Sequence, residues 1–118
     1  MKTIISVAVF LSLFSLCGAD TMEYKLQALS EKFDVPIETA TSIIKCESGF
    51  KPYAVGDSGT SYGLVQIHLP AHPYVSKQQA LDENYSLWFL FSNISKGKIG
   101  MWSCAKMLGL TYIPTSDG

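Results

Sequence analysis

Residues 37–67 read IETATSIIKCESGFKPYAVGDSGTSYGLVQI, and this stretch decides the fold because a helical repeat is followed directly by a glycine-rich turn. In the first part, apolar side chains recur at the spacing of one helix face, since about 3.6 residues complete each turn. Glu47 shares the face formed by Ala40, Ile43 and Ile44. Proline before the segment and glycine after it suit the two ends of a helix. We therefore predict a helix over 37–48 with an acidic residue on its buried face.

Glu47 is an unusual residue for such a position, because an unpaired glutamate is seldom buried. Loss of hydration and the negative end of the helix dipole both disfavour the carboxylate, so both raise the pKa of Glu47. A carboxylic acid that stays protonated near neutral pH can donate a proton to a glycosidic oxygen. Most isolated glutamates are surface or capping residues instead, and the residues that follow have to decide between the two interpretations.

The segment that follows predicts a short irregular β-hairpin opposite the end of this helix. Gly56, Asp57, Ser58 and Gly59 form a turn signal between two short segments that can pair. The same residues match the nucleophile signature of chymotrypsin-like proteases, but both histidines follow the serine and the chain is too short for two β-barrels. A turn, whose glycines let the backbone approach a ligand, is therefore the preferred interpretation.

The rest of the chain predicts further helices, so the expected fold class is mostly α with one small hairpin. Apolar periodicity and capping signals place these helices at residues 21–33, 76–81, 83–95 and from 100 or 101 to 108. We expect Trp88, Phe89 and Phe91 to lie in the core, because they fall within the strongest helical pattern.

Residues 1–19 have the pattern of a secretory signal peptide, with a basic start, an uncharged apolar run and small residues at the end. The apolar run is shorter than the roughly 20 residues that cross a bilayer, which disfavours a retained transmembrane anchor but leaves it as an alternative. We expect one domain over 20–110 and a C-terminal tail over 111–118. The protein would be secreted, extracellular or periplasmic, and would meet a membrane only through its cleaved leader.

Charge and residue types argue against several functions. The formal net charge is -1 and the chain contains no arginine, whereas a nucleic-acid-binding surface normally has a basic excess with arginine donors. His68 and His72 have the spacing of zinc ligands on a helix, but Pro70 between them prevents that helix. We expect no nucleic acid partner, no metal and no cofactor, and we expect a monomer.

Removal of the leader would also remove Cys17 and leave Cys46 and Cys104, an even number in a chain bound for an oxidising compartment. We expect a disulfide between them, worth about 4 kcal/mol in the loop-entropy model. Two buried free thiols remain the alternative. A cysteine hydrolase that uses Cys46 with His68 is disfavoured, because a bonded cysteine is no nucleophile.

These residues resemble the soluble lytic transglycosylase family of the lysozyme-like group, which also includes goose-type lysozyme. Glu47-Ser48-Gly49-Phe50 with Pro52 is similar to the family's first motif, and Gly63-Leu64-Val65-Gln66-Ile67 is similar to its second, usually Gly-Leu-Met-Gln. A weaker similarity runs through residues 80–90. The resemblance implies a lysozyme-like α+β domain in which the hairpin lies beside a cleft for a peptidoglycan glycan strand.

The resemblance also implies that Glu47 cleaves the β-1,4 bond between N-acetylmuramic acid and N-acetylglucosamine. In this family one glutamate protonates the leaving oxygen, the substrate's own N-acetyl group assists at the anomeric carbon, and the glutamate then acts as base to form an anhydro sugar. No second carboxylate is required, and such substrate assistance is a recognised exception to the two-carboxylate rule.

The sequence departs from the family in two places. The fourth motif commonly contains Ala-Tyr-Asn, whose tyrosine supports the glutamate, whereas this chain has Met101-Trp102-Ser103 near that place. The supporting group is therefore unassigned. Asp57 resembles aspartates that help position water in goose-type lysozyme, which would make the enzyme a hydrolase, although His68 stands where that group has another aspartate.

Candidate substrate-binding residues lie near the motifs: Ser48, Tyr53, Tyr62, Gln66 and Trp102. Gln66 can hydrogen-bond a glycan acetamide, with a role in satisfying the core as the alternative. The aromatic residues suit the apolar faces of sugars. A non-catalytic glycan-binding module remains the alternative from another functional class.

Overall fold

The structure of the protein, a computed structural model, describes residues 21–114. Its α-helices are α2 (Met22–Phe33), α3 (Ile37–Ser48), α4 (Lys77–Leu81), α5 (Glu83–Ser95) and α6 (Ser103–Met107). Two 3-10 helices of this part are η1 (Leu69–Ala71) and η2 (Ile99–Met101), and its strands are β1 (Val55–Gly56), β2 (Ser61–Tyr62) and β3 (Ile67–His68). The expected mostly helical fold with a small β-element is confirmed. The predicted leader and residues 115–118 lie outside the described residues.

The strands form one antiparallel sheet in the order β1-β2-β3. Val55 pairs with Tyr62 across the first two strands, and Tyr62 pairs with Ile67 across the last two. In the turn between β1 and β2, Asp57 has a positive φ of 51°, a conformation that aspartate adopts more readily than most residues. The hairpin predicted from the turn signal is therefore present, and it carries a third strand.

Local signals set most of the helix boundaries. The side chain of Thr21 accepts a hydrogen bond from the backbone N–H of Tyr24 at the start of α2, and Asp82 caps α5 in the same way. The predicted continuous helix over 100–108 is wrong: residues 99–101 form η2, Trp102 is extended, and α6 starts only at Ser103. The extended residue allows the indole of Trp102 to reach the hairpin, which a continuous helix would not.

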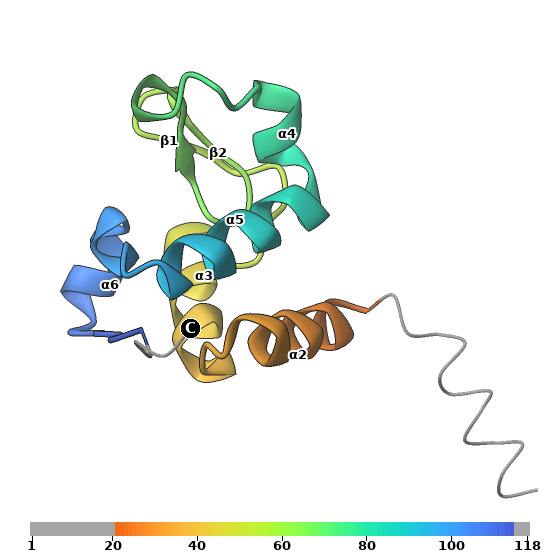
Figure 1. Ribbon diagram of the computed structural model, residues 1–118. Coiled ribbons are helices and arrows are strands. Elements are labelled where there is room, and N and C mark those ends of the chain that lie inside the picture. The colour runs from red at the N-terminus through yellow and green to blue at the C-terminus, as the bar shows by residue number, and fades with distance from the viewer. Residues whose placement is uncertain (1–20, 115–118) are drawn as a thin grey trace, which may run out of the picture.

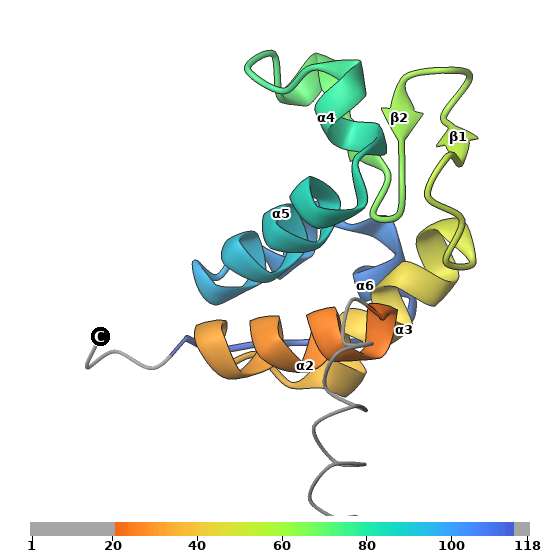
Figure 2. The ribbon, with the colours of Figure 1, turned by 90° about the vertical axis from the view of Figure 1, so that its right-hand side faces the viewer.

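The core is built around α5, which passes between α2 on one side and the lobe of the hairpin and α4 on the other (Figures 1 and 2). Its completely buried apolar residues are Leu87, Leu90, Phe91 and Ile94, and they pack in one cluster with Ile43 and Ile44 of α3. The prediction that Trp88 lies in the core is wrong, because its position falls on a side of α5 left to solvent and it is 42% exposed. Phe89 and Phe91 are buried, as predicted.

Three consecutive residues after β2 fasten the hairpin to α4, to α3 and to the extended residue between η2 and α6. Gly63 has a φ of +86° and packs against the carbonyl of Ala80 in α4 so closely that a Cβ would overlap it. The Leu64 carbonyl accepts a hydrogen bond of 2.7 Å from the Ser48 hydroxyl of α3. The Val65 carbonyl accepts one of 2.8 Å from the indole N–H of Trp102. The Gly-Leu-Val sequence is therefore a junction, and it fixes the hairpin relative to the end of α3.

The chain beyond α6 packs back onto the fold. Tyr112 contacts the core cluster, and its hydroxyl donates a hydrogen bond of 2.8 Å to the carbonyl of Asp34 in the turn between α2 and α3. Within residues 21–114, no helix has the length and apolar character needed to span a membrane.

Candidate active site

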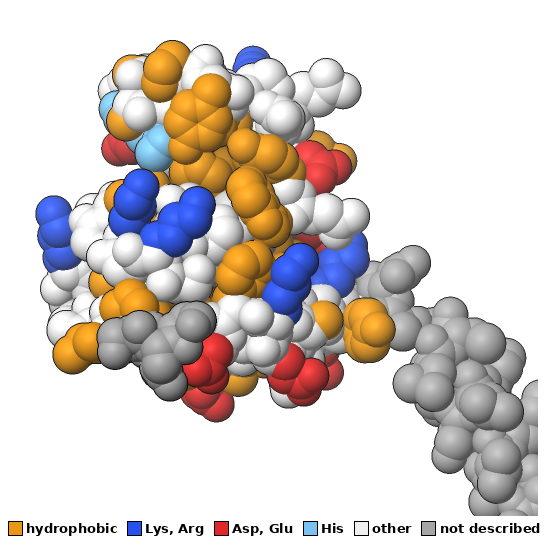
Figure 3. Space-filling view, in the orientation of Figure 1, with side chains coloured by type: hydrophobic (Ala, Val, Ile, Leu, Met, Phe, Trp, Pro, Cys, Tyr) orange, Lys and Arg blue, Asp and Glu red, His pale blue; other side chains and the backbone are white. Residues whose placement is uncertain are grey.

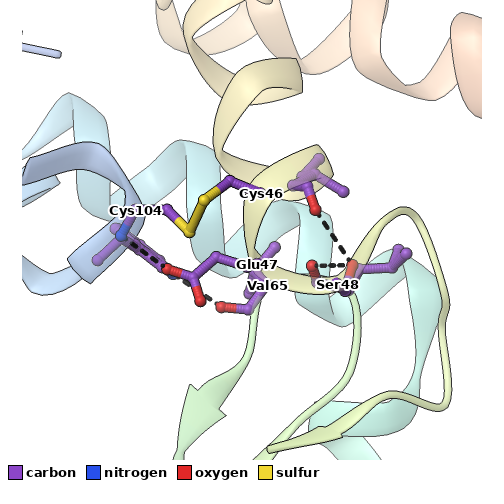
Figure 4. The surroundings of a disulfide bond; sticks show 8 residues. Cys46, Glu47, Ser48, Val65 and Cys104 are labelled. Carbon is purple, nitrogen blue, oxygen red and sulfur yellow. Dashed lines mark hydrogen bonds between the residues drawn. A yellow bond between two sulfur atoms is a disulfide. The ribbon is translucent and has the colours of Figure 1, made fainter. Parts of the chain in front are cut away.

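Glu47 lies in the last turn of α3, next to the disulfide that joins this helix to α6 (Figure 4). The structure pairs Cys46 with Cys104, with Cα atoms 5.9 Å apart, as predicted from the cysteine count. The backbone N–H of Cys104 donates a hydrogen bond of 3.2 Å to Oε2 of Glu47. The disulfide therefore keeps the backbone N–H of Cys104 in place as a hydrogen-bond donor to Glu47, the residue after Cys46.

The surroundings of Glu47 favour its protonated form. Burial raises the pKa of Glu47 above its ordinary value of 4.5 and is the largest cause, and the negative charge of Asp57 acts in the same direction. The backbone N–H of Cys104 and the side chain of Ser103 oppose the shift by hydrogen bonding the carboxylate. The net shift is upward, so the expected effect of burial at this position is confirmed.

Glu47 opens into a pocket of about 620 Å³ between the hairpin and the η2–α6 segment. The pocket is lined by Glu47, Asp57, Gln66, His68, Ala71, His72, Met101, Trp102 and Ser103. Helix α3 supplies the acid, the sheet and η1 supply one wall, and the break between η2 and α6 supplies the other. The mixture of polar groups with apolar side chains suits a ligand that has both hydroxyl groups and apolar faces.

Asp57 is held on the hairpin wall by hydrogen bonding. The Ser61 hydroxyl donates to Oδ2 of Asp57 at 2.5 Å, and it also lies 3.1 Å from Nδ1 of His68. The same imidazole nitrogen is 3.9 Å from the Asp57 oxygen. Ser61 is completely buried, whereas the Asp57 side chain is 69% exposed. A fixed hydroxyl thus orients a carboxylate that remains open to solvent and to ligands.

Gln66 has both of its amide hydrogens engaged by the backbone. Its Nε2 donates to the carbonyls of Ala54 at 3.2 Å and of Gly63 at 3.0 Å. Its Oε1 lies against Gly56, where any side chain would overlap it. The conformation of Gln66 itself is left-handed, with a φ of +53°. Among the atoms of its side chain, only the oxygen is therefore left to interact with a ligand, as an acceptor.

A comparison with protein families matches residues 25–109 to the transglycosylase SLT domain. The chain belongs to this family. SLT domains are lytic transglycosylases, so the protein is an enzyme that acts on peptidoglycan, as the motifs indicated. A search of curated proteins and a search of solved structures each found no match.

The SLT domain brings four of the predicted site residues to one pocket: Glu47, Asp57, Gln66 and Trp102. Trp102 is only 4% exposed, and its indole N–H is used by the Val65 carbonyl. Its ring lies edge-on to Phe89, with the ring centroids 6.1 Å apart. Trp102 therefore forms a fixed wall of the pocket and offers little free ring surface.

The remaining predicted site residues lie outside this lining. The Ser48 hydroxyl donates to the carbonyls of Ile44 and Leu64. Its proton is therefore used to hold the hairpin against α3. The Tyr62 hydroxyl donates to the Gly59 carbonyl at 2.5 Å. Tyr53 is 77% exposed on the segment that leads to β1.

Sequence reasoning missed Ser103 and Met101 as pocket residues. It also did not place His72 in the pocket, and it noted His68 there only as the residue that stands where goose-type lysozyme has an aspartate. Ser103 could have been found, because it precedes Cys104 and the predicted disulfide places that cysteine beside Glu47. The pKa of His72 is lowered by burial and by the nearby His68 and Lys98, which favours the neutral ring. Within the described residues, no group of three or more metal-binding side chains gathers.

Proposed function

We propose that the protein cleaves the β-1,4 bond between N-acetylmuramic acid and N-acetylglucosamine with Glu47 as its single acid and base. The observation that carries this proposal is the position of Glu47: a carboxyl group whose pKa is raised by burial opens into the pocket of an SLT domain. A protonated carboxyl group at this place is the group that bond cleavage requires first.

The reaction begins when Glu47 donates its proton to the glycosidic oxygen and the bond from that oxygen to the anomeric carbon breaks. The N-acetyl oxygen of the muramoyl sugar forms a bond to the anomeric carbon as the leaving group departs. A hydroxyl group of the same sugar then replaces it, and its proton passes to the Glu47 carboxylate. Glu47 recovers its proton, no water is consumed, and the product carries an anhydro ring.

The group that supports Glu47 is the backbone N–H of Cys104, assisted by Ser103. These donors stabilise the carboxylate that forms after the first proton transfer, while burial favours the acid before it. We propose that this pair fills the role that the sequence left unassigned. Trp102 contributes by fixing the hairpin through its bond to Val65.

We propose that Gln66 recognises the substrate through its side-chain oxygen. An acetamide N–H of the glycan matches a glutamine oxygen, because both hydrogens of the Gln66 amide are already donated to the backbone. We propose that Tyr53 and Tyr62, which lie outside the pocket lining, contact the glycan strand where it passes over the outside of the hairpin.

Hydrolysis is the second candidate, and the orientation of Asp57 favours it. Ser61 fixes the Asp57 carboxylate in the same pocket as Glu47, where it can hold a water molecule as general base. In that case water replaces the sugar hydroxyl in the second step, and the reaction is that of a lysozyme.

Digestion of purified cell walls tests these proposals. Glu47→Gln should lower the rate by about 10²–10⁴-fold, the usual contribution of a general acid. Glu38→Gln, at an exposed position in the first turn of the same helix, is the matched control. Wall lysis that survives Glu47→Gln would exclude Glu47 as the acid, and a wild-type protein that binds walls without cleaving them would indicate a glycan-binding module.

The mass of the products separates the two reactions. Anhydromuramoyl ends indicate a transglycosylase, and reducing ends that are one water heavier indicate a lysozyme. If Asp57 holds the water, Asp57→Asn should abolish the heavier product, whereas a transglycosylase should retain its product pattern in this variant.

We further propose that residues 1–19 direct the protein out of the cytoplasm, to the periplasm or beyond, where peptidoglycan lies. The N-terminal residue of the exported protein tests this, because cleavage of the leader predicts Asp20. A monomeric state is part of the same proposal, and sedimentation of the exported protein checks it.

A further inference from the structure

Two exposed aromatic side chains have no role in the site described above. Tyr74, in the loop between η1 and α4, is 70% exposed, and Trp88, on α5, is 42% exposed. Trp88 belongs to a helix whose other large apolar residues are mostly buried, so its exposure is a departure from the pattern of its own element. Exposed large apolar side chains that gather on one surface are a sign of a binding site.

These side chains are connected to the pocket by an unbroken series of rings. His72 lines the pocket, and its ring lies edge-on to Tyr74 at 5.9 Å and to Phe89 at 5.1 Å between centroids. The ring of Tyr85 lies 6.3 Å from Phe89 and 5.5 Å from Trp88. Tyr74 therefore adjoins the pocket wall at His72, whereas Tyr85 and Trp88 are linked to His72 through the buried ring of Phe89.

Figure 3 shows this surface as a band of hydrophobic side chains that runs from the lobe of the hairpin and α4 down over α5. Histidine lies at one edge of the band, and lysine side chains lie beside it over the end of α5 (Figure 3). We use the term aromatic platform for Tyr74, Tyr85 and Trp88. Its rings carry a phenolic hydroxyl or an indole N–H, so the platform offers polar groups at the edges of apolar faces.

We propose that the aromatic platform is a second glycan-binding site, which holds the part of a strand that extends beyond the pocket. The proposal rests on the proposed function, because the pocket must hold a glycan for its continuation to do so. A chain of β-1,4-linked amino sugars has apolar ring faces and many hydroxyl groups, which match tyrosine and tryptophan. Continuity through His72 selects the same strand as occupant over an unrelated partner protein.

The consequence for the enzyme is a preference for long substrates. A short oligosaccharide fills the pocket alone, whereas a longer one also gains the stacking contacts of the platform. Stacking on one aromatic ring is worth a factor of about 5–10 in affinity. Loss of one ring should therefore weaken the binding of long oligomers by that factor and leave the binding of short ones unchanged.

The test measures binding in the full chain with Glu47→Gln, so that the ligand is not consumed. The probes are the β-1,4-linked N-acetylglucosamine trisaccharide and hexasaccharide, titrated by calorimetry. Trp88→Ala and Tyr74→Ala should each raise the Kd of the hexasaccharide about 5–10-fold without changing that of the trisaccharide. Trp88→Phe and Tyr74→Phe keep a ring and should restore most of the affinity.

Met107→Ala is the matched control, because Met107 is an exposed apolar residue of α6 outside both the pocket and the platform. Its effect on both probes should be absent. Equal affinities in all variants, or an equal loss for both probes, would overturn the platform, and either result is expected if these rings serve only stability or a protein partner.

A separate readout distinguishes failure of the platform from failure of the proposed function. If the wild-type protein digests walls and the Glu47→Gln variant binds the trisaccharide and the hexasaccharide equally tightly, the platform is refuted and the proposed function stands. If the wild-type protein neither digests walls nor binds either probe, the proposed function is refuted, and the platform is refuted with it.

Discussion

At the scale of single residues, the raised pKa of Glu47 suits its proposed catalytic role but lowers the stability of the folded protein when the carboxyl group is ionised. Its folded pKa is raised, so the folded state holds its proton more tightly than the unfolded state does. The stability that this provides is fully present below the unfolded pKa and is lost as the pH rises through the folded pKa. At pH values above this raised pKa, the ionised Glu47 therefore destabilises the folded protein.

The variant Glu47→Gln should consequently be more stable than the wild-type protein at pH values above the raised pKa of Glu47, and the proposed mechanism predicts that it loses activity. The difference in Tm should be small below about pH 4 and should grow as the pH rises through the raised pKa, because glutamine does not ionise. Thermal unfolding across this pH range measures it. A difference in Tm that does not change with pH for Glu47→Gln would contradict the raised pKa.

Gly63 and Gly59 provide a second comparison at this scale. Both have a positive φ, +86° and +89°, but a Cβ at Gly63 would overlap the Ala80 carbonyl whereas a Cβ at Gly59 meets nothing. Gly59→Ala should cost about 1 kcal/mol, from backbone conformation alone. Gly63→Ala should cost about 3 kcal/mol or more, because backbone must move as well. Urea unfolding gives both values, and similar costs would show that the contact with α4 is unimportant.

At the scale of elements, the disulfide joins the two segments that form the carboxyl environment of Glu47. Replacing Cys46 and Cys104 together with serine should cost about 4 kcal/mol of stability by the loop-entropy model. Activity should fall as well in the protein that remains folded, because the N–H of residue 104 is no longer held beside the acid. Unfolding and wall digestion measured at a low temperature separate the two effects.

Reduction supplies the control for that variant. A reductant should lower the activity and stability of the wild-type protein to those of the double serine variant, and it should leave the variant itself unchanged. An active, fully stable reduced protein would show that the bond has no such role.

The helices could be predicted from the sequence wherever local signals agreed. The 83–95 helix was predicted at both ends, because Asp82 caps it and its periodicity is strong. The segment after residue 99 was not predicted correctly. The helix is interrupted at Trp102, whose indole N–H bonds the carbonyl of Val65, 37 residues away in the chain, and no local pattern shows such a contact. The prediction that Trp88 lies in the core failed for a similar reason. The periodicity of a helix does not show which of its sides has no neighbouring element.

The same limit applies to the site. Glu47 could be proposed because its position on the buried face follows from the local repeat of α3. Gln66 could be proposed because it closes the second motif, and Asp57 because of the resemblance to goose-type lysozyme. The lining by Met101, Ser103 and His72 depends on how the segments around η1 and η2 are placed on opposite sides of the pocket, which no local pattern predicts. Ser48 and Tyr62 satisfy backbone carbonyls, a use that no sequence pattern distinguishes from ligand binding.

At the scale of the whole molecule, the C-terminal end of the described residues packs against the core and the turn between the first two helices. Tyr112 packs on the core and bonds the Asp34 carbonyl, which links the C-terminal segment to the turn before α3. Removing residues 111–118 should cost about 2–4 kcal/mol, since it deletes a partly buried aromatic side chain. Tyr112→Phe keeps the ring and should cost only about 1 kcal/mol. Chemical unfolding of both variants checks this, and equal stability of the truncated protein would contradict it.

The junction at residues 63–65 has a further consequence for how the groove works. Gly63 packs against α4, the Leu64 carbonyl is hydrogen-bonded to α3, and the Val65 carbonyl is hydrogen-bonded to Trp102. The base of the hairpin is therefore held at three points. The tip around residues 55–60, which carries Asp57, is joined to these residues by the pairing of β1 with β2, so its position depends on theirs. Changes at the buried Ala80, or at Ser86, whose hydroxyl donates a hydrogen bond of 2.7 Å to the Ala80 carbonyl, should therefore alter the width of the pocket that a glycan enters.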